Sequence, residues 1–181
     1  MTTLKLMENV LRKLDRPVDE STVALYADRL LGYLNEAMLD LTAEFRPWRR
    51  DTLLVTGGQA DLSGLPRTCL KVLAARIDGQ RRLFYYGPTR HTLLFPGMGD
   101  GSVELTYRYQ PALLRELGDE PQLPEGFEGL LTEYAAARER SRFDAASQNA
   151  AKLDLTLYRE MKGKLRRGYP APDLSQIYHI Y

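Results

Sequence analysis

Few side chains in the sequence could do nucleophilic or acid–base chemistry. The 181 residues include one cysteine, Cys69, and two histidines, His91 and His179. Cys69 directly precedes an apolar stretch with no histidine nearby in sequence, which favours a buried, unreactive thiol over a nucleophile. One cysteine excludes an intramolecular disulfide framework and a thiolate-rich zinc site, and two histidines argue against a histidine-rich metal cage. We therefore expect no catalytic, metal or cofactor site.

Glycine-rich segments offer a second kind of chemistry, because such loops can cradle phosphate groups. Gly97, Gly99 and Gly101 lie between two predicted strands, and neither a helix nor a phosphate-binding lysine follows them. Residues 56–58, Thr-Gly-Gly, lack the same features. Both segments therefore predict turns.

The elements that would position these residues begin with two helices. Apolar residues recur at helical spacing over residues 4–14 and again over 23–45, and Pro17 separates the two stretches. Asp19 and Ser21 are candidate N-caps of the second helix. That helix should end before Pro47, which cannot continue it.

The helical pattern returns after Pro111 in two further segments. The apolar residues of the first are Phe127, Leu130, Leu131 and Tyr134. Those of the second, at four-residue steps, are Leu153, Leu157, Met161 and Leu165. Residues that favour turns and caps predict a break between Phe143 and Asn149, so we expect an antiparallel helix pair.

Between the helical parts the pattern changes to strands and turns. Asp78-Gly79 is a strong hairpin signal. Strands are expected at residues 53–55, 69–77, 82–86, 92–95 and 103–109. The sequence thus predicts an α+β fold. It is a mainly helical bundle formed by residues 1–50 and 111–167, with a small antiparallel β-domain inserted at 51–110 and an extended C-terminal tail at 168–181.

The composition describes an ordinary globular protein. Lys and Arg number 25 and Asp and Glu 24, which gives a net charge of +1. Broad affinity for nucleic acid depends on many phosphate contacts and a basic surplus, so this balance argues against a DNA-binding protein. The apolar runs are far shorter than the roughly 20 residues that span a bilayer, and residues 1–14 lack the apolar block of a signal peptide. We expect neither export nor membrane attachment.

Charge is unevenly distributed behind this near-neutral total. Residues 116–137 contain six acids and no Lys or Arg, whereas residues 138–167 contain nine basic residues and four acids. Such opposite segments could pair within one chain or between neighbouring copies in a ring, and the sequence leaves both open. The candidate contacts between copies are Glu125, Glu128, Glu133, Arg138, Arg142 and Lys162.

The C-terminal segment is unusually apolar for a free tail. Residues 168–181 contain two prolines and end in Ile-Tyr-His-Ile-Tyr. Free tails are usually more polar, so we expect this one to be held by a partner, with folding back on its own domain as the alternative.

The order of several short strings resembles the head-to-tail adaptor, or connector, proteins of tailed bacteriophages. The strings lie at residues 4–14 with Pro17, then 33–37, 60–62, 65–66, 70–73, 93–97, 103–107, 123–125 and 134–135. Each string is weak alone, and together they span roughly residues 3–165.

This resemblance implies a structural, non-enzymatic protein of the virion neck, assembled in the host cytoplasm. It implies a homo-oligomeric ring, dodecameric in this family, that sits beneath the portal protein. The ring would continue the channel through which double-stranded DNA passes without specific binding, and it would receive a downstream tail or nozzle protein. By the same resemblance, the portal-docking residues are Tyr169, Ile177, Tyr178, His179, Ile180 and Tyr181. The alternatives are another neck or tail-completion protein and a small intracellular enzyme using Cys69 or His91.

Overall fold

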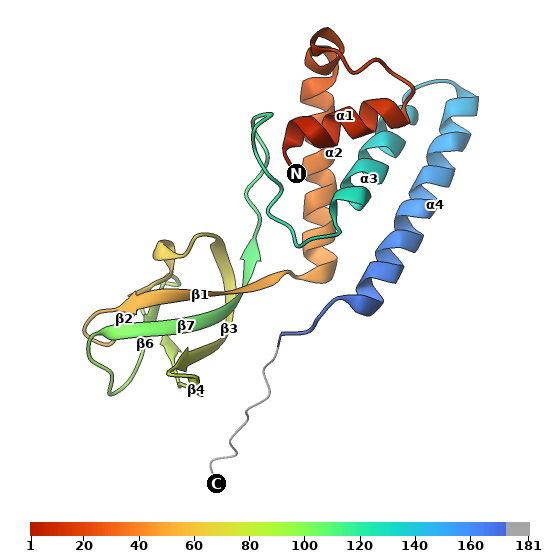
Figure 1. The fold of residues 1–181 in the computed structure, drawn as a ribbon. Coiled ribbons are helices and arrows are strands. Elements are labelled where there is room, and N and C mark those ends of the chain that lie inside the picture. The colour runs from red at the N-terminus through yellow and green to blue at the C-terminus, as the bar shows by residue number, and fades with distance from the viewer. Residues whose placement is uncertain (173–181) are drawn as a thin grey trace. The chain divides into compact units, whose positions relative to one another are not determined.

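The computed structural model describes residues 1–172, which form two compact units (Figure 1). The helical unit contains Met1–Phe45 and Pro111–Tyr169, and the β unit contains Arg46–Gln110 with the described residues 170–172. Four helices and a small set of antiparallel strands confirm the predicted α+β fold class.

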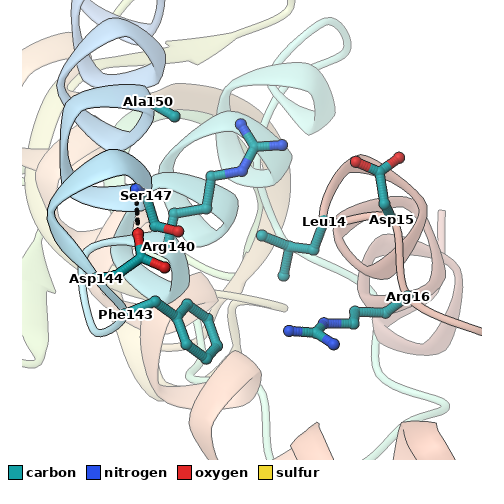
Figure 2. A pocket seen from close by; sticks show the side chains of 8 residues that line it. All are labelled: Leu14, Asp15, Arg16, Arg140, Phe143, Asp144, Ser147 and Ala150. Carbon is teal, nitrogen blue, oxygen red and sulfur yellow. Dashed lines mark hydrogen bonds between the residues drawn. The ribbon is translucent and has the colours of Figure 1, made fainter.

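Four helices make up the helical unit. They are α1 (Thr3–Lys13), α2 (Glu20–Phe45), α3 (Glu128–Arg140) and α4 (Ala145–Gly168). Asp19 starts α2 as predicted, because its carboxylate accepts a hydrogen bond from the Thr22 amide at 2.9 Å. Hydrogen bonds from Ser21 and Thr22 lower the pKa of Asp19 to about 2. At α4 the cap is Asp144, which accepts from the Ser147 amide at 2.8 Å (Figure 2). A break between the two helices is therefore confirmed, but it lies at residues 141–144, at the start of the predicted range, and α4 includes Asn149.

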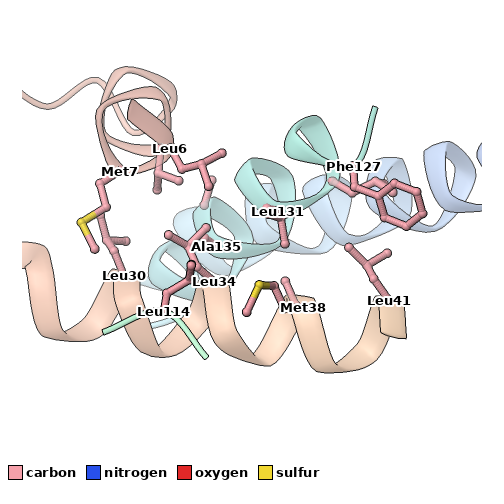
Figure 3. Packing of buried hydrophobic residues seen from close by; sticks show 14 of the residues in the cluster. Leu6, Met7, Leu30, Leu34, Met38, Leu41, Leu114, Phe127, Leu131 and Ala135 are labelled. Carbon is pink, nitrogen blue, oxygen red and sulfur yellow. The ribbon is translucent and has the colours of Figure 1, made fainter. Parts of the chain in front are cut away.

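The core of the helical unit is arranged around α3, which lies between α2 and α4 and also contacts α1 (Figure 1). Ala135, Ala136 and Ala137 are fully buried, and their small side chains let the neighbouring helices approach closely. The surrounding apolar residues include Leu6, Met7, Leu30, Leu34, Met38, Leu41, Leu114, Phe127 and Leu131 (Figure 3). Burial of these side chains is the main stabilising contribution in this unit.

The segment that leads into α3 also completes the start of α1. The Thr3 amide donates to the Asp119 carbonyl at 2.7 Å, and the Leu4 amide donates to the Leu117 carbonyl at 2.9 Å. The first amides of a helix have no partner inside it. Carbonyl groups far along the chain therefore accept the hydrogen bonds that the first amides of α1 cannot make within the helix.

The β unit consists of two antiparallel sheets. Its strands are β1 (Trp48–Val55), β2 (Gln59–Asp61), β3 (Thr68–Ile77), β4 (Gln80–Arg81), β5 (Tyr85–Tyr86), β6 (Thr92–Leu94) and β7 (Gly101–Gln110). A short 3-10 helix, Leu62–Gly64, follows β2. The sheet orders are β1-β7-β3-β4 and β2-β6-β5. Strand β7 is thus the centre of the larger sheet and carries the predicted alternating residues.

Two turns of the β unit follow the sequence signals. Asp78 and Gly79 have φ values of 49° and 77° and join β3 to β4. Gly57 and Gly58, at 56° and 75°, join β1 to β2. Positive φ at both central residues is the geometry that closes a two-residue hairpin. Both predicted turns are confirmed.

The predicted return strand at residues 82–86 is wrong as one continuous strand, although Tyr85 and Tyr86 do form a strand. After the two residues of β4, the chain leaves the larger sheet and enters the smaller one as β5, which pairs with β6. Strand β2 has only three residues and was not predicted. Segments this short carry too few residues for a pattern of period two.

The predicted apolar face of α4 is correct only toward its C-terminal end. Leu153 and Leu157 are 72 % and 41 % exposed, while Met161 and Leu165 pack against the core. An α-helix has 3.6 residues per turn, so each step of four residues turns the position by about 40°. The leucine series therefore winds from the solvent side to the buried side. In the first half of α4 the buried face is Ala151, Asp154 and Tyr158.

Candidate assembly surfaces

The base of the C-terminal segment is held by an aromatic cluster of the helical unit. The Tyr169 ring meets the Phe45 ring edge-on at 5.4 Å between centroids, and the Phe127 ring at 5.9 Å. Phe45 and Phe127 themselves pack at 4.8 Å. Edge-to-face packing of this kind stabilises by about 0.5–1.5 kcal/mol per pair beyond area burial. Tyr169 is thus anchored on its own chain, and Ile177–Tyr181 lie outside the described residues.

Two of the candidate charged residues link helices within the chain. Lys13 of α1 donates to Glu133 of α3 at 2.7 Å. Lys162 of α4 lies 2.9 Å from Asp40 and 2.7 Å from Glu44, both on α2. These charges therefore join α3 to α1 and α4 to α2.

The remaining candidates are closer to solvent. Arg138 lies 3.2 Å from Glu36 of α2, with both side chains nearly half exposed. Glu128 accepts a hydrogen bond from the Gly126 amide at 3.1 Å, near the start of its own helix. Arg142 pairs with Glu139 at 3.6 Å. Glu125 is exposed in the segment before α3.

Asp40 is the centre of the contact between α2 and α4. It accepts hydrogen bonds from the Tyr158 hydroxyl and the Lys162 ammonium. Burial works to raise the pKa of Asp40, but these two donors outweigh it and lower the pKa. Burial and the bond to Asp40 raise the pKa of Tyr158 above its usual value. The pair therefore consists of a carboxylate and a neutral phenol at neutral pH.

A buried glutamate joins α2 to α3. Glu139 is 1 % exposed, and its carboxylate lies 3.4 Å from the Arg29 guanidinium and 3.6 Å from that of Arg142. An unpaired buried charge is strongly destabilising, so these arginines are needed where Glu139 sits. Nothing in the sequence marks Glu139 as buried, because its position within a charged run resembles that of a solvated residue.

The hollow drawn in Figure 2 lies between the end of α1 and the turn that joins α3 to α4. The Arg16 guanidinium lies 5.7 Å from the centre of the Phe143 ring. Arg140 pairs with Asp154 at 2.6 Å and also donates to the Lys13 carbonyl. Three of the charged side chains that line the hollow are thus engaged, Arg140 by Asp154, Arg16 by Phe143 and Asp144 by the Ser147 amide. The hollow is therefore a joint between helices.

Cys69 and His91 have different surroundings in the described structure. Cys69 is a half-buried residue of β3, and burial raises the pKa of its thiol to about 11. At neutral pH such a thiol is almost entirely protonated and a poor nucleophile. His91 is exposed and lines an open groove with Asp61 and Thr92, and the described residues lining that groove do not include Cys69.

Residues 1–172 also bear on metal binding and on membrane crossing. No cluster of three or more His, Cys, Asp or Glu side chains in this range could hold a metal ion. None of the helices described is long and apolar enough to cross a membrane.

Comparison with protein families decides the identity of the chain. A family model described as SU10 adaptor protein matches residues 1–175. The chain belongs to the SU10 adaptor family. A comparison with curated proteins gives no match.

The SU10 family is one of phage head-to-tail adaptors, so the resemblance predicted from the short strings is confirmed. The adaptor is accordingly a structural protein of the bacteriophage virion, with its place in the neck. Membership of a structural family favours a non-enzymatic role, in agreement with the protonated Cys69. The matched range passes Gly168 and includes Tyr169, which extends the resemblance beyond the predicted residues 3–165.

One residue inside the quoted strings gains a role from the structure. Asn35, in the string at residues 33–37, binds the backbone of Leu114 through both its amide atoms at 2.8 and 3.0 Å. It thereby fixes the segment between β7 and α3. Asparagine is an unfavourable helix former. Its presence inside a long helix was therefore the sequence signal that could have pointed to a specific role for Asn35.

Proposed function

We propose that the adaptor assembles into a closed ring beneath the portal protein of a filled capsid. The ring, dodecameric in the predicted form, continues the DNA channel and gives the tail its attachment platform. It assembles on the capsid in the host cytoplasm. The observation that carries this proposal is the family match over residues 1–175.

The segment after Tyr169 is the proposed portal-docking element. Tyr169 packs on Phe45 and Phe127, so the segment leaves the helical unit at a fixed point. Residues 173–181 would reach about 30 Å if fully extended and include Ile177, Tyr178, His179, Ile180 and Tyr181. Aromatic and branched side chains that fill pockets supply much of the binding energy of an interface. We therefore assign the anchoring role to Tyr169 and the portal contact to the five residues that end the segment.

DNA is a passenger in this proposal. Each phosphate contact adds salt-dependent affinity for DNA and would slow its passage. A net charge of +1 on 181 residues provides no broad basic surface. Near-neutrality therefore suits the lining of a channel.

The test is a pair of variants measured against the purified portal. A chain that stops after Pro172 keeps Tyr169 on its aromatic cluster and should fold normally, but its affinity for portal should fall by at least about tenfold. A full-length Ile177→Ala, Ile180→Ala variant should show the same direction of change. Portal binding equal to that of the full chain in both variants would refute the docking assignment, and the thermal unfolding curve serves as the folding control.

A further inference from the structure

The helical unit presents two outward helix faces on opposite flanks. Helix α3 lies between α2 and α4, so the sides of α2 and α4 that point away from α3 face in different directions (Figure 1). On α2 the outward stripe includes Leu25 and Leu39, which are 69 % and 47 % exposed. Gly32 lies between them with open space beside its Cα.

The outward face of α4 carries the two leucines that the core does not use. Leu153 and Leu157 are one helical turn apart, and both are exposed. Isolated exposed leucines are ordinary on a protein surface. Here, however, α2 and α4 each expose two leucines on the side away from the core. Contact with a partner would explain this arrangement.

Charge identifies the partner as another copy of the chain. Helix α2 contains five acids and one arginine, whereas α4 contains six basic residues and two acids. Asp28 on α2 and Lys152 and Lys164 on α4 are exposed, and they have no ion-pair partner within residues 1–172. The α2 face is therefore the electrostatic complement of the α4 face.

The same charges disfavour the symmetric alternatives. A two-fold contact would place α4 against α4, two helices that each carry a net charge of +4, or α2 against α2, two helices that each carry −4. Like charges at an interface weaken it. A contact between two different faces is heterologous, and repetition of it generates a ring when the rotation closes.

The hydrogen bonds between α2 and α4 within one chain also indicate which residues of the two helices lie at the same height. Asp40 binds Tyr158 and Lys162, so the end of α2 lies level with this part of α4. A cyclic ring has no translation along its axis. For helices that run along that axis, Leu157 of one copy then comes level with Leu39 of the next.

We infer that the outward face of α4, through Leu153 and Leu157, packs on the outward face of α2 of the neighbouring copy around Leu39. This inference rests on the proposed ring and names its contact surfaces. Apolar burial supplies the attraction, and the opposite charges select this pairing over the symmetric ones.

Two complementary variants test the pairing. Leu39→Lys places a cation on the face that meets basic α4, which blocks the α2 face and leaves α4 intact, and Leu157→Asp does the reverse. Each alone should weaken self-assembly on the portal by about tenfold or more. A mixture of the two should form a heterodimer through its one pair of intact faces and stop there, as measured by native mass spectrometry. Leu113→Asp, at an equally exposed leucine of the 111–127 segment, is the control and should assemble like the unmodified chain.

Cysteine pairing gives a readout that does not depend on weakened assembly. Chains with Leu39→Cys and Leu157→Cys, mixed on the portal and oxidised, should cross-link far more than either alone. Normal rings from both the Leu39→Lys and the Leu157→Asp variants would overturn the α2–α4 contact, and so would mixed rings without the cross-link. Either result would leave the ring itself standing. If the unmodified chain forms no ring on its portal, the proposed function fails, and this inference fails with it.

Discussion

The Asn35 side chain binds both backbone polar groups of Leu114: its carbonyl accepts from the Leu114 amide at 2.8 Å, and its amide donates to the Leu114 carbonyl at 3.0 Å. These bonds tie the middle of α2 to a segment 79 residues further along the chain. Leu114 is itself buried in the helical core. One side chain thus fixes the point at which the chain re-enters the helical unit.

Replacing this amide should destabilise the helical unit. Asn35→Ala leaves two partly buried backbone groups without their partner, and the expected loss is about 1–3 kcal/mol of unfolding free energy. Asn149→Ala, on the exposed face of α4, is the matched control and should change stability by less than about 0.5 kcal/mol. Urea denaturation followed by circular dichroism measures both. Equal effects of the two substitutions would contradict the assigned role of Asn35.

The hydrogen bond between Tyr158 and Asp40 should contribute to the free energy of unfolding. Tyr158→Phe removes the hydroxyl that binds the carboxylate, and the expected loss at pH 7 is about 1 kcal/mol because Asp40 is nearly half exposed. Tyr134→Phe removes a weaker, exposed bond to Glu36 at 3.3 Å and should cost less. A Tyr158→Phe protein as stable as the unmodified one at pH 7 would refute the contribution of this bond.

The same contact predicts a pH dependence with a definite sign. The folded chain lowers the pKa of Asp40 below its ordinary 3.8, so this contribution is complete above that pH and disappears as the pH falls through the lower folded value. The folded chain raises the pKa of Tyr158 above 10, so its contribution is lost as the pH rises through the raised value. The stability difference between Asp40→Asn and the unmodified chain should therefore shrink in strong acid. A difference that grows in acid would reverse the sign and contradict the assignment.

Neighbouring glycines of the β1–β2 turn should respond differently to alanine. A Cβ at Gly57 would meet only open space, whereas a Cβ at Gly58 would lie 2.7 Å from the Met98 carbonyl oxygen. Both positions have positive φ. We expect Gly57→Ala to cost about 1 kcal/mol from backbone strain alone, and Gly58→Ala at least about 2 kcal/mol because backbone must also move. Thermal unfolding of the two variants tests this order, and equal losses would be inconsistent with the turn as described.

Cys69 should react slowly with thiol reagents. With a pKa of about 11, the thiolate makes up about 0.1 % of the thiol at pH 8. Alkylation by iodoacetamide in the folded protein should therefore be at least about a hundredfold slower than that of free cysteine, and denaturation should remove the difference. Alkylation of the folded chain at the rate of free cysteine would revive the nucleophile interpretation.

Much of the fold could be predicted because its signals are local. Asp19 and Asp78-Gly79 act within a few residues of themselves, so their cap and turn are legible in the sequence. The buried face of α4 was not predictable from leucine spacing, because Asp154 and Tyr158 occupy buried positions that binary patterning assigns to apolar residues. Their partners Arg140 and Asp40 make those positions tolerable.

The candidate surfaces were harder to predict than the fold because they depend on distant pairs. The run of opposite charges in residues 116–167 predicted a pairing, but it could not show that Glu133 meets Lys13, 120 residues away. The position of Tyr169 against Phe45 is a long-range packing fact of the same kind. The contacts of Glu125, Glu128, Glu133, Arg138, Arg142 and Lys162 with a neighbouring copy remain a prediction.

Electron microscopy of the purified adaptor mixed with its portal tests the central claim most directly. The account predicts a closed ring of adaptor copies, twelve in the expected form, coaxial with the portal and enclosing an open channel. Portal particles without ring-shaped adaptor density, at adaptor concentrations that saturate any binding, would contradict it.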